Sequence, residues 1–309
     1  MPAYEAMNRP GPVAQRMLEI LLAGVSTRRY ARVIPAMAET VGVSRETIEA
    51  SERVLKKLME RRLDGWDLLV IYLDGIQFGD YHVLGAVGVD VEGKKHVLGV
   101  REGASENAEV TRALLEDLVV QGVDTGHRQL FVLDGSKVLR SALDQVFGRQ
   151  HHVQRCRNHK VRNVVGHLPK ELQAQARATM RAAWKLEAKE GEQKLDQFAR
   201  WLERDYPSAA ASLREGLGEM FTINRLGLPL WLRRCLTSTN LIDSTHSGVR
   251  QKTHRVTNWK NGTMALQWAA SSFVETEKSY RKIIGHQELW MLKAHLDDRD
   301  QAVELKKAG

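Results

Sequence analysis

Two runs of apolar residues, each ending in Asp-Gly, constrain the fold of this chain most strongly. In the first run, residues 68–73 (LLVIYL) precede Asp74, and in the second, residues 129–133 (QLFVL) precede Asp134. Short apolar runs bounded by turn residues are typical of buried strands. Because ligand groups in α/β sheets gather where strands end, both carboxylates are candidates for a functional site.

The predicted elements around these two runs follow the order strand, strand, strand, helix, strand, helix, strand. Their predicted ranges are 68–73, 81–89, 96–100, 108–120, 129–133, 136–147 and 151–154. The first three strands are joined by a Gly turn, which favours a meander, whereas the later alternation of strands and helices favours an α/β layer with a mixed sheet. Beyond this layer, residues 169–220 and 239–290 are predicted to be helical, with a basic loop near residues 252–262 in the second stretch.

The front of the chain, residues 1–65, is predicted to form a small group of helices. Gly42 interrupts the periodic pattern, and Ser44 can cap a helix that runs from Arg45 towards Arg61. Two helices joined by a short Gly-containing turn suit a helix-turn-helix, which would place Arg45 and Thr47 against DNA. An ordinary helical bundle fits the same pattern equally well.

Composition excludes several classes of protein. The chain has 309 residues, enough for about two domains, and contains no run of about 18 apolar residues and no signal-peptide pattern. Membrane, secreted and fibrous classes are therefore excluded, and with only two cysteines we expect a cytoplasmic protein. Lys and Arg number 46 against 38 Asp and Glu, a net charge of +8 that favours a polyanionic partner.

Three acidic residues are candidates for a metal site. Asp74 and Asp134 end strands that we expect to be neighbours, and two such carboxylates could hold a hard divalent cation. The alternative is that Asp-Gly simply makes two strand-ending turns. Asp243 would lie in the first turns of a capped helix and could supply a third carboxylate, although an acid there also compensates the helix dipole.

Basic residues are concentrated in two stretches that border these acids. Residues 149–170 contain no acid, and residues 233–260 contain only Asp243. Runs of charged residues usually lie on a solvent-exposed face without a specific partner. Cations beside a carboxylate cluster, however, suit a phosphodiester substrate. Trp259 could stack on bases, whereas core packing is favoured for Trp268. The residues predicted to contact DNA in these stretches are Arg155, Arg157, Lys160, Arg162, Arg250, Lys252, Arg255 and Lys260.

Cys156 and His159 form a Cys-x-x-His pair directly after the last predicted strand. Such a pair could be half of a zinc site, but zinc normally takes four ligands and the remaining Cys and His residues match no zinc spacing. Packing within a helix is the favoured interpretation.

Several of these motifs together resemble one family. VIYLDGIQFGDYHVLGAVGVDVEGKKHVLGV, LFVLDGSKVLRSAL, VQRCRNHKVRNVVGHLP and STNLIDSTHSGVRQKTHRV are similar to segments of the Mutator-type transposases of bacterial insertion sequences. The similarity runs from about residue 26 to about residue 293. It implies a ribonuclease H-like domain with a mixed five-stranded sheet, whose three acids bind Mg²⁺ in a two-metal site that could also take Mn²⁺.

The resemblance assigns residues and domains. Asp74 and Asp134 match the first two acids, and Cys156 and His159 match a family motif of unknown role. Asp243 falls where the family usually has Glu, in TNLIDS; its carboxylate would reach about 1 Å less far, which can cost about 10²-fold in rate. The implied domains are a helix-turn-helix-like segment at 1–65, a catalytic core at 66–168, a helical insertion at 169–236 and a C-terminal part of the core at 237–309.

The resemblance also implies a function: Mg²⁺-dependent cleavage and strand transfer at the terminal inverted repeats of an insertion sequence, by a homo-oligomer on double-stranded DNA, with no membrane partner. The matched segment begins near the start of this chain, which implies a shortened copy that lacks part of its recognition of the element ends. The alternatives are an inactive remnant that only binds DNA, favoured by Asp at position 243, and a general metal-dependent nuclease.

Overall fold

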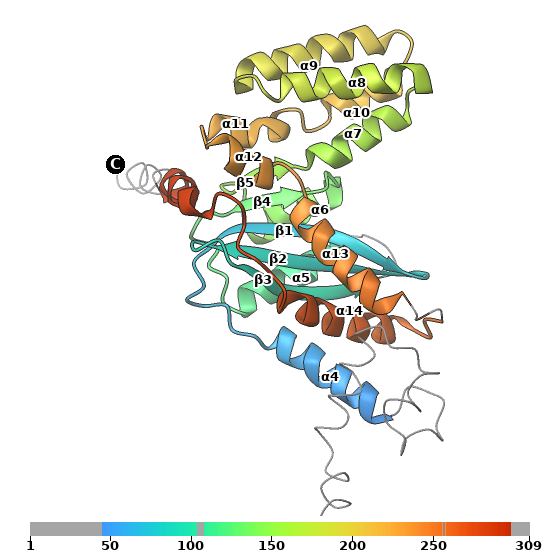
Figure 1. Ribbon diagram of the computed structural model, residues 1–309, viewed down its shortest axis with the longest axis vertical. Coiled ribbons are helices and arrows are strands. Elements are labelled where there is room, and N and C mark those ends of the chain that lie inside the picture. Colours follow the sequence, from blue (N-terminus) through green and yellow to red (C-terminus); the bar gives the residue numbers. More distant parts are fainter. Residues whose placement is uncertain (1–44, 104–107, 255, 257, 298–309) are drawn as a thin grey trace, which may run out of the picture.

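A mixed sheet lies at the centre of the molecule (Figure 1). The computed structural model describes residues 45–103, 108–254, 256 and 258–297, with only the backbone for 45–47. In this part of the chain the strands are β1 (Leu68–Phe78), β2 (Tyr81–Asp90), β3 (Lys95–Gly103), β4 (Leu130–Leu133) and β5 (His152–Arg155). They lie in the order β3-β2-β1-β4-β5, antiparallel from β3 to β1 and parallel from β1 to β5. The predicted mixed α/β layer and its order of elements are confirmed.

The prediction that the first strand ends at Asp74 is wrong. β1 continues to Phe78, because β2 pairs with it antiparallel along this extension and supplies its backbone hydrogen bonds. Asp74 therefore lies inside a strand, opposite Gly85 of β2. β4 does end before Asp134, and Gly135 follows with a φ of 111°, in the left-handed region that glycine adopts without strain.

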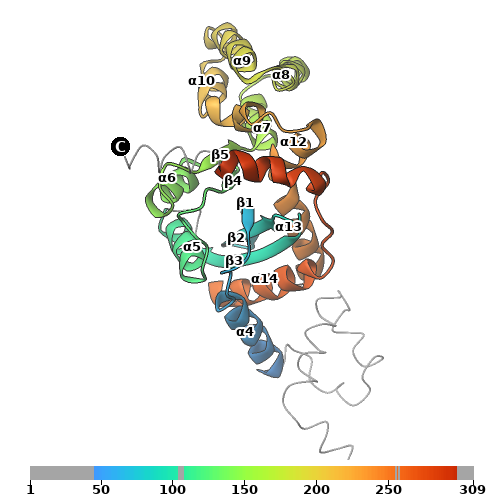
Figure 2. The same cartoon turned by 90° about the vertical axis from the view of Figure 1, so that its left-hand side faces the viewer.

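Helices cover both faces of the sheet (Figure 2). On one face lie α5 (Ala108–Val120) and α6 (Lys137–Val146), and on the other α13 (Asn240–Thr253) and α14 (Gly262–Glu277). Successive residues of β1 alternate between the two faces: Ile71 and Leu73 join the core cluster under α5 and α6, whereas Val70 and Tyr72 join the opposite cluster. This alternation explains why β1 is apolar at every position from 68 to 73.

A group of helices between β5 and α13 has its own core cluster. These helices are α7 (Arg157–Gly166), α8 (Lys170–Ala183), α9 (Ala188–Glu203) and α10 (Pro207–Arg214), followed by η3 (Gly218–Phe221), α11 (Thr222–Arg225) and α12 (Leu230–Leu236). Side chains of α7 to α10 and η3 pack on each other rather than on the sheet. In Figure 1, α8 and α9 lie at one end of the molecule and α4 at the other. The predicted helical character of residues 169–220 is confirmed.

At the opposite end, α4 (Arg45–Met59) packs against α14 and β3. The predicted helix starting at Arg45 is confirmed, and its Ala50 packs on Trp268, which is buried as expected. The rest of the predicted helix-turn-helix, residues 1–44, lies outside the described residues. After α14, the chain ends its described part with η4 (His286–Glu288) and a helical stretch at 289–297. Within the described residues, no helix is both long and apolar enough to cross a membrane.

Candidate metal centre

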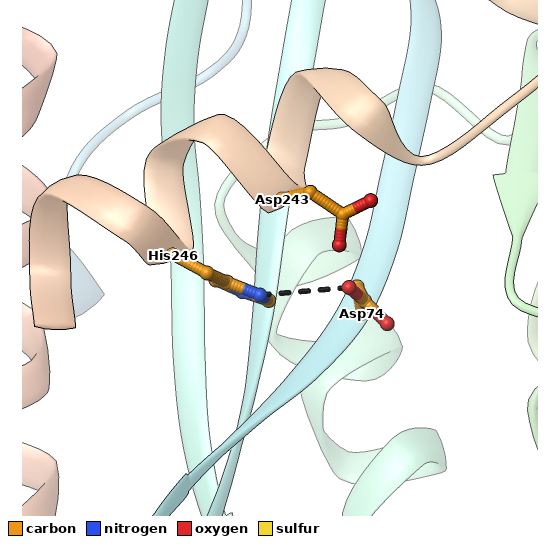
Figure 3. A group of neighbouring side chains, drawn as sticks. All are labelled: Asp74, Asp243 and His246. Atoms are coloured by element: carbon orange, nitrogen blue, oxygen red, sulfur yellow. Dashed lines mark ion pairs between the residues drawn. The ribbon is translucent and has the colours of Figure 1, made fainter.

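Two acids and a histidine converge beside the middle of β1 (Figure 3). Asp74 comes from β1, and Asp243 and His246 come from the first two turns of α13. One potential ligand atom from each lies within 4.8 Å of the others. Asp243 and His246 are three positions apart on a helix, so their side chains leave the same face. The packing of α13 on the sheet thus brings distant parts of the sequence to one point.

Burial makes the charge of Asp74 costly. Its side chain is only 9% exposed, and removal from water raises the pKa of this carboxyl to about 8. The neighbouring His159 lowers this pKa, whereas Asp243 and Asp134 raise it further. A carboxylate held among other acids with little water is the arrangement that a bound cation relieves.

His246 is the most enclosed member of the group. Its side chain is 1% exposed, and its Nδ1 lies 3.5 Å from Oδ2 of Asp74. Desolvation lowers the pKa of His246 to about 3, with Arg250 and His82 lowering it further, so the imidazole is neutral at physiological pH. The ring of Phe273 on α14 meets it edge-on, with centroids 5.7 Å apart, and fixes its position from behind.

Asp134 lies near this group without joining it. Its charge raises the pKa of Asp74, which places the two carboxylates within electrostatic range, yet Asp134 is absent from the group of ligand atoms within 4.8 Å. Oδ1 of Asp134 accepts a hydrogen bond of 2.7 Å from the backbone N–H of Ser136, which is the N-cap of α6. One oxygen of Asp134 therefore stabilises a turn, as the alternative interpretation of Asp-Gly expects, and the other is left for a second contact.

The Cys-x-x-His pair lies beside the acids. Cys156 is the N-cap of α7, and its Sγ accepts hydrogen bonds from the backbone N–H groups of His159, at 3.5 Å, and Thr239, at 3.3 Å. Burial raises the pKa of the Cys156 thiol, but hydrogen bonds from His159 and Thr239 outweigh it, so the pKa falls below its usual value. The hydrogen bond to Cys156 raises the pKa of His159 to about 9 despite its desolvation. Among the described residues, no third metal ligand completes a set with this pair.

Thr239 connects the Cys-x-x-His pair to the acids. Its Oγ1 lies 3.4 Å from Sγ of Cys156 and 3.3 Å from Nδ1 of His159. The same oxygen lies 3.3 Å from Oδ2 of Asp243. A single buried hydroxyl thus contacts the thiol, the imidazole and the carboxylate.

Three of the basic residues predicted to contact DNA make internal contacts instead. Arg155 is 5% exposed and pairs with Glu219 at 3.1 Å. Arg157 donates to the carbonyl of Met220 and lies over the ring of Trp184. Lys160 is 2% exposed, and its Nζ donates to the carbonyl of Ser212 at 2.6 Å. The contact of Arg155 links β5 to η3, and those of Arg157 and Lys160 link α7 to η3 and α10.

The remaining predicted DNA contacts are placed differently. Arg162, Arg250 and Lys260 are exposed, and Lys252 is half-buried. Arg255 and the side chains of Arg45 and Thr47 lie outside what the structure describes. Trp259 is half-buried and meets Phe78 edge-on at 5.0 Å, so part of its ring already packs internally.

Sequence reasoning did not identify His246, although the signal was present. Its position three residues after Asp243 in a predicted helix places it on the same face as the acid. Thr239 directly precedes the predicted helix and could cap it, but nothing in the local sequence indicates its contacts with Cys156, which lies 83 positions earlier. His82 of β2 also lies within electrostatic range of His246 and Asp134.

Comparisons with a family profile and with individual proteins identify the same family. The family profile described as "Transposase, Mutator family" matches residues 7–282. The transposase for insertion sequence element IST2 of Acidithiobacillus ferrooxidans is 30% identical over 200 residues, which cover 64% of this chain and 65% of that protein. A probable insertion sequence transposase of Corynebacterium diphtheriae is 26% identical over 306 residues, covering 94% of this chain and 82% of that protein.

A third relative, the transposase for insertion sequence element ISRM5 of Rhizobium meliloti, is 24% identical over 284 residues, covering 85% of this chain and 68% of that protein. The matched segments thus span from 65% to 82% of the lengths of these three relatives. Because the family profile covers most of the chain and these relatives are all insertion sequence transposases, the chain belongs to the Mutator family of transposases.

Proposed function

We propose that this chain cleaves DNA strands and transfers them at the terminal inverted repeats of an insertion sequence, with a divalent metal ion held in a ribonuclease H-like core. The observation that carries the proposal is the convergence of Asp74 from β1 and Asp243 from α13 at one buried point. The proposed core comprises residues 66–168 and 237–309, with residues 169–236 as a helical insertion. Residues 1–65 are proposed to bind the element ends, and homo-oligomerisation on DNA is part of the proposal.

The side chains present fit a divalent cation. Carboxylate oxygens are ligands that Mg²⁺ and Mn²⁺ accept, and the burial that raises the pKa of Asp74 is offset when a cation is bound. Asp74 and Asp243 would hold the metal, with Asp134 as the third acid. A bound divalent cation would lower the pKa of an attacking water and stabilise the negative charge on the leaving oxygen.

Asp134 fits the third position because its charge already acts on Asp74. One of its oxygens is engaged in the turn before α6, which leaves the other for the metal ion. Thr239 holds Oδ2 of Asp243 at 3.3 Å, which limits the rotation of this short side chain. The chain's own groups therefore orient the carboxylates before substrate arrives, and such preorganisation is the main contribution a protein makes to phosphoryl transfer.

The DNA backbone would be bound by exposed cations. Arg250 lies on α13, one turn beyond His246, Arg162 lies on α7, and Lys260 lies in the segment before α14; all three are exposed. Each phosphate contact of this kind makes affinity fall with salt. The engagement of Arg155, Arg157 and Lys160 in internal contacts moves the proposed DNA surface away from them.

A nicking assay tests the proposal. Purified protein is mixed with labelled element ends in Mg²⁺, and Asp74→Asn and Asp134→Asn are compared with the parent. Both variants should lose nicking because each removes a charged metal ligand. The matched control is Asp80→Asn, which removes an exposed acid at the end of the same hairpin and should cut like the parent. If Asp74→Asn and Asp134→Asn cut as well as the parent, the metal assignment is wrong.

The inactive DNA-binding remnant is tested by Asp243→Glu. The presence of Asp243 within the acid cluster supports an adapted site, which should respond in rate when the longer side chain is introduced. A dead remnant should stay inactive with either residue. A general nuclease is separated by comparing element ends with unrelated DNA of equal length, because only a transposase should prefer the ends.

A further inference from the structure

His246 lies in the acid cluster as if it were a third ligand. Figure 3 shows its ring pointing from α13 towards the carboxylate of Asp74, with Asp243 beside it. The 3.5 Å between Nδ1 of His246 and Oδ2 of Asp74 is long for a hydrogen bond. Two ligand atoms that each lie about 2.1 Å from a shared ion are separated by roughly 3 to 3.5 Å. The observed spacing therefore suits two ligands of one ion better than a direct hydrogen bond.

A neutral imidazole that binds an ion through Nδ1 keeps its proton on Nε2. Nε2 of His246 is buried and finds no hydrogen-bond partner among the described residues. The ligand atom would therefore be Nδ1, which faces Asp74 in a ring that is only 1% exposed.

We propose that His246 is a nitrogen ligand of the metal ion, with Asp74 and Asp243 as its oxygen ligands, and that the site prefers Mn²⁺ to Mg²⁺. This inference rests on the carboxylate site of the proposed function. Mg²⁺ takes oxygen ligands almost entirely, whereas first-row transition ions accept imidazole readily. The imidazole comes from the next turn of the same helix as Asp243. It therefore adds a ligand beside the short side chain of Asp243 and compensates for its limited reach.

Direct binding of Mn²⁺ to the full-length chain tests the preference. Mn²⁺ is titrated into the metal-free protein, and the unbound ion is followed by electron paramagnetic resonance, with Mg²⁺ as competitor. His246→Asn should weaken Mn²⁺ binding by about tenfold or more, and Mg²⁺ binding much less. The matched control is His254→Asn, an exposed imidazole at the C-terminal end of the same helix, which should bind like the parent. Equal Mn²⁺ affinity in the parent and His246→Asn would overturn the inference.

A spectroscopic measurement needs no variant and so does not depend on how His246→Asn folds. Electron spin-echo modulation of Mn²⁺ bound to the parent should show coupling to a directly bound nitrogen, which changes when the protein is labelled with ¹⁵N-histidine. Bound Mn²⁺ without nitrogen coupling would overturn the inference.

The outcomes separate this inference from the proposed function. If Asp74→Asn abolishes both Mn²⁺ binding and nicking in Mg²⁺ while nitrogen coupling is absent, the carboxylate site stands and the role of His246 fails. If the parent binds no Mn²⁺, the inference fails, and nicking in Mg²⁺ decides the proposed function independently.

Discussion

At the scale of single residues, Thr239 is the side chain that links the Cys-x-x-His pair to Asp243. Its hydroxyl lies within 3.4 Å of Cys156, His159 and Asp243. On the proposed function, a group in this position would act through Asp243 rather than on the DNA. Outer contacts of metal ligands typically contribute 10–100-fold in metal affinity or activity.

Thr239→Val is expected to lower the single-turnover rate of nicking about tenfold without changing DNA affinity, because it removes the hydroxyl and keeps the shape. Thr239→Ser retains the hydroxyl and should stay close to the parent. Nicking is followed with saturating protein, and DNA affinity by fluorescence anisotropy. Equal rates for the Val and Ser variants would show that the hydroxyl has no positioning role.

Lys160 gives a prediction about pH. Burial lowers the pKa of this amine to about 8, with Arg155 lowering it further and Glu215 opposing. Between about pH 8 and 10.5, the unfolded chain holds this proton and the folded protein does not. The contribution of Lys160 therefore makes the free energy of unfolding increase with pH across this window, by at most about 3 kcal/mol.

Lys160→Met should remove this contribution, so the free energy of unfolding of the parent should increase relative to that of the variant as pH rises from 7.5 to 10. Urea denaturation at several pH values measures it. Lys170→Met, at an exposed position of the next helix, is the control and should show a constant difference. A constant difference for Lys160→Met would contradict the assignment.

Single residues were predictable from the sequence where local pattern decides their surroundings. Asp74 and Asp134 are candidates in the sequence because each follows an apolar run typical of a buried strand, where ligand groups of α/β sheets gather. The internal contacts of Arg155 and Lys160 were not predictable, because their partners Glu219 and Ser212 lie in a segment whose packing the local sequence does not indicate.

At the scale of elements, β2 and α14 approach each other closely beside His246. A Cβ at Gly85 would lie 2.7 Å from Cζ of Phe273, so only glycine leaves room for this ring. The same ring backs His246, and Gly85 pairs with Asp74 across the two strands. Strand, helix and the proposed metal ligands are therefore mutually constrained at this point.

Gly85→Ala should reduce the free energy of unfolding by about 1–3 kcal/mol through overpacking. Adding Phe273→Leu should recover part of the loss, since the shorter side chain gives way. The control is Gly166→Ala at the end of α7, where a Cβ meets nothing within 4 Å and a gain of up to about 1 kcal/mol is expected. Thermal or urea unfolding measures all three. Strictly additive losses in the double variant would argue against the contact.

Element types followed from periodicity, but one strand end did not. The segment after Asp74 contains Gly75 and Gln77, which are weak strand formers, so the local pattern favours a stop. Pairing with β2 along the whole hairpin overrides that preference. Strand ends set by a partner strand are decided by tertiary contacts, and a single segment does not contain that information.

At the scale of the whole molecule, the helices from α7 to α10 form a core cluster distinct from the two clusters on the sheet. Cooperative units in proteins often coincide with such clusters and open at different free energies. We therefore expect α8 to α10 to open without unfolding the sheet.

Native-state hydrogen exchange tests this expectation with two variants of fully buried residues, Leu195→Ala in the helical cluster and Val132→Ala in β4. Leu195→Ala should lower the protection of α8 to α10 by about 2–5 kcal/mol and leave β1 almost unchanged. Val132→Ala should lower the protection of β1. Equal losses in β1 for the two variants would mean that helices and sheet unfold as one unit.

The convergence of β1 and α13 has a consequence for synthesis on the ribosome. Asp74 and Asp134 emerge well before Asp243 and His246, and at about 5–20 residues per second the interval between Asp74 and Asp243 is roughly ten to thirty seconds. During that interval the nascent chain holds acids without the helix that completes their cluster. On the proposed function, a partly made chain therefore lacks Asp243 and cannot cut DNA until α13 has docked.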